Sequence, residues 1–233
     1  SFLRIMGSTH GLHISLFVAL VILIAIFGTL RGEIFFLPRN IFNILNAVTM
    51  LGLLAFVITV LLVGGAIDIS IGSNVGLCSI TTATVLTMVD SPAAGIATAF
   101  VVGGLAGLFN GLLVTYGRIN PIIATLGTLS AFRGLAFIVS DGLSIGVVNP
   151  NFTWIGSERV LDVPVPTIVF AVAAVLFFLF MRYTRAARHI YGIGGNIEAA
   201  LFSGINVTRY RIFMYASCGL VCGLTAILLT ART

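Results

Sequence analysis

The sequence contains no lysine and few charged residues of any kind. Charged side chains make up 8% of the 233 residues, and all 12 basic residues are arginine. A Walker A motif for ATP requires a lysine, so this chain cannot carry one and a partner must handle any ATP. Hydrophobic residues make up 59% of the chain, and the mean hydropathy is +1.17. This composition excludes a water-soluble domain and indicates an integral membrane protein.

Long apolar stretches recur along the chain at lengths that suit membrane helices. Six of them contain no charged residue, and a seventh, 121–140, is interrupted only by Arg133. Each approaches the roughly 20 residues that a helix needs to cross the hydrocarbon of a bilayer. The six uncharged stretches are 14–30, 44–63, 73–89, 93–116, 164–181 and 212–231. We therefore predict an all-α, polytopic helical membrane protein, a single transmembrane domain over 1–233 with about seven spans.

The arginines divide unevenly between the predicted connections. With the N-terminus inside, seven lie on the cytoplasmic side and three outside, where most of the acids also lie. The inner seven are Arg4, Arg118, Arg182, Arg185, Arg188, Arg209 and Arg211. Because cytoplasmic loops carry an excess of positive charge, this distribution predicts a cytoplasmic N-terminus. The basic face would lie beside the anionic lipid of the bilayer, and no basic patch with interleaved aromatics indicates a nucleic-acid partner.

The sequence shows no catalytic or metal-ligating constellation. Cys78, Cys218 and Cys222 all lie inside predicted spans, where small packing residues are expected and a disulfide framework is not. The histidines have no ligand-like spacing, and no nucleophile has a partner base. We therefore predict no catalytic residue, no metal site and no enzyme activity.

Glycines recur at four-residue spacing in two predicted spans. They are Gly103, Gly107 and Gly111 in one span, and Gly219 and Gly223 in the other. Small residues at this spacing let helices approach closely in lipid, so both spans are predicted to pack tightly. Asn110 lies in the first of these spans, where it either hydrogen-bonds a neighbouring helix or lines a pathway.

The stretch GGAIDISIG, residues 64–72, places Asp68 directly after a span without any charge. A charge in hydrocarbon costs at least a few kcal/mol, so Asp68 needs a partner or solvent. In a first interpretation the helix breaks at the paired glycines, and Ser70 or Ser73 caps a new helix. In a second, the stretch is a cytoplasmic connection with Asp68 in solvent. In a third, Asp68 titrates and couples proton movement.

We favour the first interpretation, because the stretch is short and apolar for an aqueous loop and no relay of acids accompanies it. It predicts one helix broken around 64–72, in which Asp68 accepts backbone hydrogen bonds or pairs with an arginine. Ser70 and Asn74 are then better candidates for facing a pathway.

Arg133 lies in the outer half of its span, about 18 to 20 Å from the inner end at about 1.5 Å per residue. It either snorkels outward or pairs with a neighbour, or it lines the outer mouth of a pathway. The candidate pathway residues are therefore Asp68, Ser70, Asn74, Asn110 and Arg133.

Two connections are longer than the others. The outer one, 141–163, holds the only tryptophan, Trp154, and either lies on the membrane surface or contacts a partner. The inner one contains GGNIEAALFSGIN at 194–206, in which Asn196 is a good N-cap, Glu198 suits the helix dipole and Gly204 is a stop signal. These signals predict a helix of about two turns, which is marginal in water alone and needs a surface to dock against.

Three motifs occur in order at fixed places relative to the spans. They are GGAIDISIGSNVG at 64–76, GRINPIIATLGTLSAFRGLAF at 117–137 and YGIGGNIEAALFSGINV at 191–207. In these motifs the chain resembles the permease subunits of bacterial ABC importers for ribose, xylose, galactose and related sugars, including the autoinducer-2 importer branch. The resemblance runs from about residue 41 to the end.

The resemblance implies a ten-helix subunit in the bacterial cytoplasmic membrane. It would pair with a second copy or a close relative, and the pathway would form between the two. A cytoplasmic ATPase subunit would use ATP and Mg²⁺, a periplasmic sugar-binding protein would deliver the sugar, and the permease itself would bind no cofactor. This sequence ends after the seventh predicted span, so the family's last three helices are absent from it and we expect these 233 residues alone not to transport.

The resemblance also assigns roles to the two longer connections. The segment 192–206 would be a cytoplasmic coupling segment inserted into a groove of the ATPase, with an interfacial helix resting on lipid as the alternative. Its candidate coupling residues are Gly195, Asn196, Glu198, Ala199, Ala200, Ser203 and Gly204, of which the two alanines would permit close approach. In the outer segment, the binding protein would contact Asn149, Trp154 and Glu158, with Trp154 as a membrane-interface anchor in the alternative.

The sequence therefore predicts a permease subunit of an ATP-driven importer for a pentose, hexose or similar polyol-like solute. The alternatives are a branched-chain amino acid permease of the same superfamily and a proton-coupled secondary carrier that uses Asp68. The binding protein carries much of the selectivity in such systems, so the sequence does not name the sugar.

Overall fold

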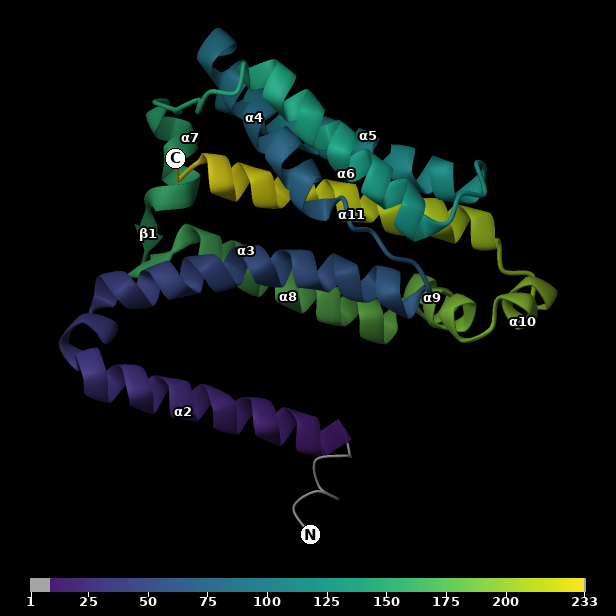
Figure 1. Cartoon of the computed structure of the whole chain (residues 1–233), viewed down its shortest axis with the longest axis horizontal. Helices are drawn as coiled ribbons and strands as arrows, with labels where there is room; N and C mark the ends of the chain where they lie inside the picture. Colours follow the sequence, from purple (N-terminus) through teal and green to yellow (C-terminus); the bar gives the residue numbers. More distant parts are fainter. Residues whose placement is uncertain (1–8, 233) are drawn as a thin grey trace. The chain divides into compact units, whose positions relative to one another are not determined.

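The computed structural model describes residues 9–232, which are helical almost throughout (Figure 1). Arg4, which was predicted to lie on the cytoplasmic side, is outside the described residues. The chain divides into two units between Ala47 and Val48, inside helix α3 (Pro38–Val63). Seven described helices are long and apolar enough to cross a membrane, which confirms the predicted polytopic helical membrane protein.

The first unit, up to Ala47, contains α2 (Thr9–Phe35) and the beginning of α3. α2 covers the predicted span 14–30, and its helical geometry is interrupted at Arg31, where φ is −148° and ψ is 43°. Phe27 and Phe35 stack on either side of this interruption, with ring centroids 5.8 Å apart. Most apolar side chains of α2 are exposed, as expected for a helix with a lipid-facing surface.

The second unit, from Val48, holds the remaining elements. Its long helices are the rest of α3, α4 (Ile71–Val89), α5 (Pro92–Thr115), α6 (Pro121–Ser140), α8 (Val165–Tyr183) and α11 (Val207–Thr230). Three short helices lie in the connections: α7 (Pro150–Ser157), α9 (Arg185–Gly195) and α10 (Ile197–Phe202). The strands of the described part, β1 (Arg159–Val160) and β2 (Val163–Pro164), form one antiparallel hairpin.

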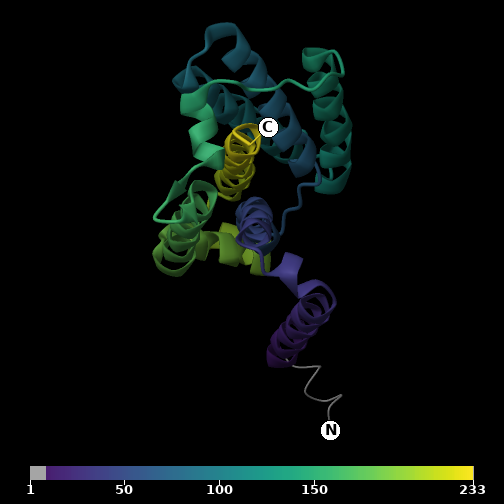
Figure 2. The ribbon, with the colours of Figure 1, turned by 90° about the vertical axis from the view of Figure 1, so that its left-hand side faces the viewer.

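The glycine faces of α5 and α11 pack directly against each other, and Figure 2 shows α11 in yellow, end-on. A side chain at Gly103 would overlap with the backbone of Gly219, and one at Gly107 with the backbone of Tyr215. A side chain at Gly223 would likewise meet the backbone of α5. The predicted tight packing of these two spans is confirmed, and both helices have almost no freedom to accept larger residues here.

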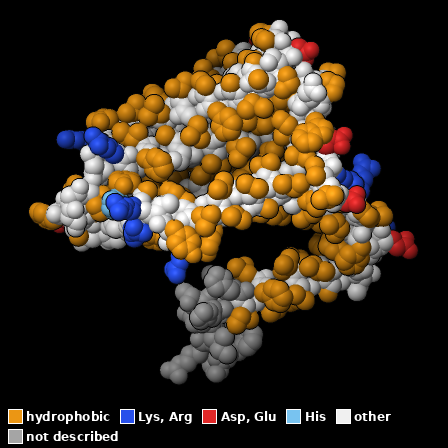
Figure 3. Space-filling view, turned by 180° about the vertical axis from the view of Figure 1, so that it is seen from behind, with side chains coloured by type: hydrophobic (Ala, Val, Ile, Leu, Met, Phe, Trp, Pro, Cys, Tyr) orange, Lys and Arg blue, Asp and Glu red, His pale blue; other side chains and the backbone are white. Residues whose placement is uncertain are grey.

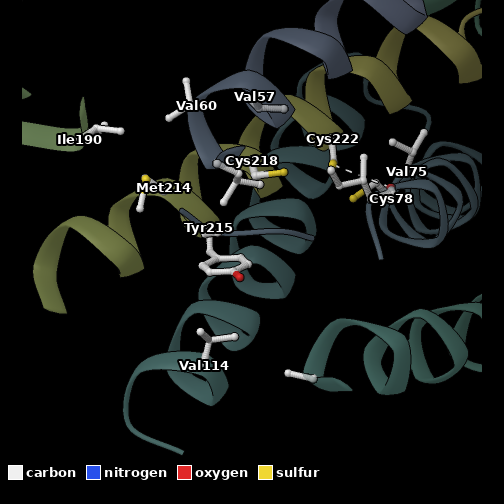
Figure 4. Packing of buried hydrophobic residues seen from close by; sticks show 14 of the residues in the cluster. Val57, Val60, Val75, Cys78, Val114, Ile190, Met214, Tyr215, Cys218 and Cys222 are labelled. Carbon is white, nitrogen blue, oxygen red and sulfur yellow. Dashed lines mark hydrogen bonds between the residues drawn. The ribbon is translucent and has the colours of Figure 1, made fainter. Parts of the chain in front are cut away.

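The largest buried cluster lies where α3, α4, α5 and α11 meet. Tyr215, Cys218 and Cys222 of α11 lie in this cluster together with Val57 of α3 and Cys78 of α4 (Figure 4). All three cysteines are free thiols and are fully buried. They therefore occupy the packing positions that the sequence predicted.

The exposed surface of the second unit is largely apolar along its helices. Leu51, Val101 and Val175 are each more than half exposed. Figure 3 shows hydrophobic side chains along the length of the helices and charged side chains at the helix ends. Lipid tails can cover such a surface. In water, the same surface would be an unusually large exposed apolar area.

Candidate functional site

The break predicted at residues 64–72 is present. α3 ends at Val63, Gly65 adopts a φ of +72°, and α4 begins only at Ile71. Glycine adopts this left-handed conformation without steric cost, which explains why the chain turns there. Ser70 occupies the N-cap position of α4, but its side chain makes no capping hydrogen bond.

Asp68 lies half-buried in the break and accepts three hydrogen bonds. The backbone N–H of Ser70 donates to Oδ1 at 2.8 Å, and the Ser70 hydroxyl donates to the same atom at 2.6 Å. The Asn110 amide, from α5, donates to Oδ2 at 3.1 Å. The prediction that Asp68 receives a backbone N–H is confirmed. Its further partners are the Ser70 hydroxyl and the Asn110 amide.

Asn110 ties the break to the neighbouring helix. Its side chain is fully buried, and its amide also donates to the Ser70 hydroxyl oxygen at 2.8 Å. The predicted hydrogen bond between helices is therefore present. The carbonyl oxygen Oδ1 of Asn110 is buried without a hydrogen-bond partner among the described residues, a position that a buried water could satisfy.

Tyr215 of α11 holds the break from the other side. Its ring is fully buried among the residues of the largest cluster (Figure 4). Its hydroxyl donates a 2.9 Å hydrogen bond to the carbonyl oxygen of Ile67. Tyr215 was not predicted from the sequence. The available signal was a tyrosine inside an apolar span, because a phenol buried in lipid or protein needs a partner for its hydroxyl.

Ser70 and Asn74, which were predicted to face a pathway, are 0% and 2% exposed. Asn74 Oδ1 accepts a weak hydrogen bond from the Cys78 thiol at 3.3 Å, so this side chain points into the core. In this structure both residues stabilise packing. Their pathway role stays a prediction that would require the helices around them to separate.

An open groove lies on the opposite side of α4, between α4 and α6. It has a volume of about 370 Å³ and is lined by Gly72, Ser73, Gly76, Leu129, Arg133 and Ala136. Gly72 and Gly76 have open space where a side chain would extend. Arg133 is exposed and lines this groove. The two glycines were missed as lining residues, although their four-residue spacing places them on one face of a helix.

The outer segment is anchored by α7. Phe152 is fully buried, and Gly156 lies against the backbone of Ala231 at the end of α11. Asn149 Oδ1 caps α7 by accepting from the N–H groups of residues 151 and 152, and its amide donates to Asp90 Oδ1 at 2.7 Å. Asn149 thus has a structural role that the sequence analysis did not predict.

Trp154 and Glu158 remain exposed on this segment. Leu161, at the tip of the β-hairpin, is 93% exposed and was missed. Its signal was an apolar residue in the two-residue turn of VLDV, where polar residues are usual. These three residues are part of the exposed outer face, to which Leu143 and Val148 also belong.

The inner segment forms the predicted short helix, α10, of six residues. Asn196 Oδ1 caps it by accepting from the N–H of Ala199 at 3.0 Å, and Gly204 ends it with a φ of +80°. Glu198 lies in its first turn. These local predictions are confirmed, and Gly195, Ala199 and Ser203 are exposed.

The expectation for Ala200 is wrong. Ala200 is 4% exposed and packs against Ile193 and Val207 of the same chain, so it cannot form the surface that approaches a partner. The exposed apolar side chains of α10 are instead Ile197, Leu201 and Phe202, the last of them 93% exposed. The sequence fixes the helix and its ends, but six residues are too few for periodicity to show which side faces inward.

The inner segment also contacts the break. Gly194, next to the end of α9, lies against the carbonyl group of Val63 with no space for a side chain. Gly64 lies against the side chains of Met214 and Ile190. A movement of α9 would therefore press directly on the point where α3 ends.

Comparison with known proteins identifies the family. Residues 40–233 match the family described as branched-chain amino acid transport system / permease component. A ribose import permease protein of Bacillus subtilis (strain 168) is 38% identical over 218 residues, which cover 93% of this chain and 67% of that protein. An autoinducer 2 import system permease protein of Photorhabdus temperata is 34% identical over 232 residues, covering 97% of this chain and 69% of the relative.

An L-arabinose ABC transporter permease protein of Azospirillum brasilense is 34% identical over 214 residues, covering 91% of this chain and 63% of that protein. No solved structure matches the chain. The family match covers most of the chain, and the identities extend over all three motifs that carried the resemblance. The chain therefore belongs to the branched-chain amino acid transport system / permease component family, and it is a multi-pass membrane permease component rather than an enzyme.

Proposed function

We propose that this chain is the transmembrane permease subunit of an ABC importer that passes a sugar across the bacterial cytoplasmic membrane. The matched relatives are named for import of ribose, L-arabinose and autoinducer 2, and this favours a sugar or related polyol-like solute over a branched-chain amino acid. The permease would be one domain, 1–233, with an outer loop at 141–163, a coupling segment at 192–206 and its N-terminus in the cytoplasm.

The partners follow from this proposal. A separate ABC ATPase would bind ATP and Mg²⁺ on the cytoplasmic side, and a periplasmic sugar-binding protein would dock on the outer face. A second permease subunit, either a further copy or a close paralogue, would complete the pathway. Trp154, Glu158 and Leu161 are the exposed residues of the outer face that the binding protein would contact.

The proposed docking of α10 on the ATPase rests on one observation. α10 exposes Ile197, Leu201 and Phe202, while its buried side rests on the chain through Ala200. A six-residue helix is too short to be stable alone, so its exposed apolar side needs a partner surface. A groove of the ATPase would supply that surface, with Phe202 as the anchor.

The contact between α9 and the break gives this docking a route to the membrane. A shift of α10 would move α9. Gly194 would pass this movement directly to Val63, because no space is left between the two residues. Residues 64–72 would move together with α5 and α11, since Asn110 and Tyr215 bond them to these helices. The groove between α4 and α6, which contains Ser73 and Arg133, would widen or narrow as a result.

The hydrogen bonds around Asp68 bear on the proton-coupled alternative. Its described hydrogen-bond partners are a backbone N–H, a hydroxyl and an amide, and no second acid is among them to pass a proton on. Asp68 is therefore best explained as the structural centre of the break.

The proposal is tested by assembly and hydrolysis. The permease should co-purify with an ABC ATPase, and the ATPase rate of the reconstituted complex should rise when a binding protein loaded with ribose or arabinose is added. The same addition with leucine and a leucine-binding protein should have no effect. Stimulation by leucine alone would support the amino acid alternative, and absence of any bound ATPase would contradict the proposal.

A further inference from the structure

Two neighbouring cavities lie along α11. The first, of about 440 Å³, has the exposed Arg209 at its mouth and is lined by His189, Asn206, Arg209, Tyr210 and Phe213, among others. The His189 ring is held there by a 2.7 Å hydrogen bond between Nδ1 and the Tyr210 hydroxyl. Arg209 is exposed, and no described residue pairs with its guanidinium group. The mouth of this cavity is thus suited to an anion.

The second cavity, of about 350 Å³, is an apolar groove between α3, α8 and α11. Phe56, Phe177, Phe180, Phe213 and Leu224 are among its lining residues. Phe56 stacks on Phe177 with ring centroids 4.7 Å apart, which gives the groove a rigid aromatic wall. Ser217 is the one polar residue in its lining.

Phe213 lines both cavities, so the two adjoin along α11. From Phe213 to Leu224 the groove follows α11 for about 16 Å, at about 1.5 Å per residue. That length is about half of the roughly 30 Å hydrocarbon core, the depth of one leaflet. Taken together as one combined cavity, the two adjoining spaces have the length to hold a single lipid molecule, with its headgroup at the helix end beside Arg209 and a tail directed toward the bilayer centre.

The charged side chains in the lining indicate which class of lipid would bind. No acidic side chain lines either cavity in the described part of the chain, whereas His189 and Arg209 both lie at the mouth. An apolar helix face in the groove would contact only the apolar lining, whereas a phospholipid would also bring an anionic group to Arg209 and His189. An anionic phosphate group satisfies that mouth through charge-assisted hydrogen bonds.

We propose that one anionic phospholipid binds in this combined cavity, with its phosphate at Arg209 and His189 and an acyl chain along Phe213 in the groove. Such basic pockets between membrane helices are a recognised type of site for anionic lipid headgroups. The lipid would join α3, α8 and α11 on the side where α9 meets the break. This inference goes beyond the proposed transport function and does not depend on the identity of the sugar.

The test uses the purified permease without its ATPase, so that failure of the transport proposal leaves it unaffected. The protein is equilibrated with equal amounts of phosphatidylglycerol and phosphatidylethanolamine of identical acyl chains, and retained lipid is measured by native mass spectrometry. We expect phosphatidylglycerol to be retained at about one molecule per permease. Arg209→Gln should reduce its retention about fivefold, the effect expected for one arginine near an anionic headgroup. Arg118→Gln, an equal loss of charge at a different cavity, should leave retention unchanged.

The groove is tested separately. Ser217→Trp places a ring in the acyl path and should abolish retention, whereas Val175→Trp, on the exposed side of α8, should not. Equal retention of the two lipids, equal effects of Arg209→Gln and Arg118→Gln, or unchanged retention in Ser217→Trp would overturn the proposal. Arg209 is exposed, so its variant decides the question even if the tryptophan variant does not fold.

Discussion

Gly194, in the last turn of α9, lies against the carbonyl group of Val63, the final residue of α3, with no room for a side chain between them. This contact joins the segment that contains α9 and α10 to the broken helix. Gly195, the next residue, has open space around the position of a side chain. The two neighbouring glycines therefore offer a matched comparison.

We predict that Gly194→Ala destabilises the permease by about 1 to 3 kcal/mol, because overpacked positions force the backbone to shift. Gly195→Ala should be neutral or slightly stabilising, since alanine is the better helix residue. Thermal unfolding of both variants in detergent measures the difference. Equal unfolding midpoints for the two variants would show that Gly194 of α9 is not tightly packed against α3.

The carboxylate of Asp68 should be irreplaceable by a neutral group of the same shape. Both of its oxygens accept hydrogen bonds, one from Ser70 and one from Asn110. In Asp68→Asn the new amide nitrogen is itself a donor, so it must face one of these two donors and lose that hydrogen bond. Asp68→Leu removes every acceptor, leaves the amide of Asn110 unpaired and should cost about 1 to 3 kcal/mol.

A double variant provides the control for this pair. Asp68→Asn combined with Asn110→Asp restores one carboxylate and one amide with their positions exchanged, and it should recover part of the stability lost in the single variants. Folded yield and unfolding temperature are the measurements. Native stability in Asp68→Leu would instead place Asp68 in solvent.

A charge introduced on α10 should impair partner binding on the exposed side of the helix and folding on its buried side. Phe202→Glu changes a side chain that is 93% exposed, so the permease should insert and fold but lose co-purification with the ATPase. Ala200→Glu buries a charge against Ile193 and Val207 and should lower the folded yield itself. If Phe202→Glu retains the ATPase and transports normally, α10 is not the coupling helix.

Two aromatic residues of α7 separate docking from folding in the outer segment. Trp154→Ala should leave the unfolding temperature unchanged but weaken the stimulation of ATPase activity by the loaded binding protein. Phe152→Ala, at a fully buried position, should cost about 3 to 5 kcal/mol. Equal loss of basal and stimulated ATPase activity in Trp154→Ala would indicate a membrane anchor instead of a docking residue.

Features carried by local chemistry could be predicted from the sequence. Paired glycines followed by a lone acid predict the break at 64–72, and Asn196 with Gly204 predicts both ends of α10. The spacing of Gly103 and Gly107 predicts a close helix contact. In each case a few neighbouring residues determine the backbone or the size of the interface.

Features that depend on distant parts of the chain could not be predicted. The bond from Tyr215 to Ile67 joins residues 148 positions apart, and no local pattern selects that partner. The burial of Ala200 depends on how α10 rests on Ile193 and Val207. Likewise, the open side of α4 at Gly72 follows from the placement of α6, which tertiary packing determines.

We propose above that this permease imports a sugar and that ATP drives the import. The most direct measurement is uptake of labelled ribose, arabinose and leucine by proteoliposomes that contain the complete permease subunit with its ATPase and binding protein. We expect uptake of a sugar that requires ATP, persists when the proton gradient is abolished, and does not extend to leucine. Uptake of leucine in place of the sugars, or sugar uptake driven by a proton gradient without ATP, would contradict it.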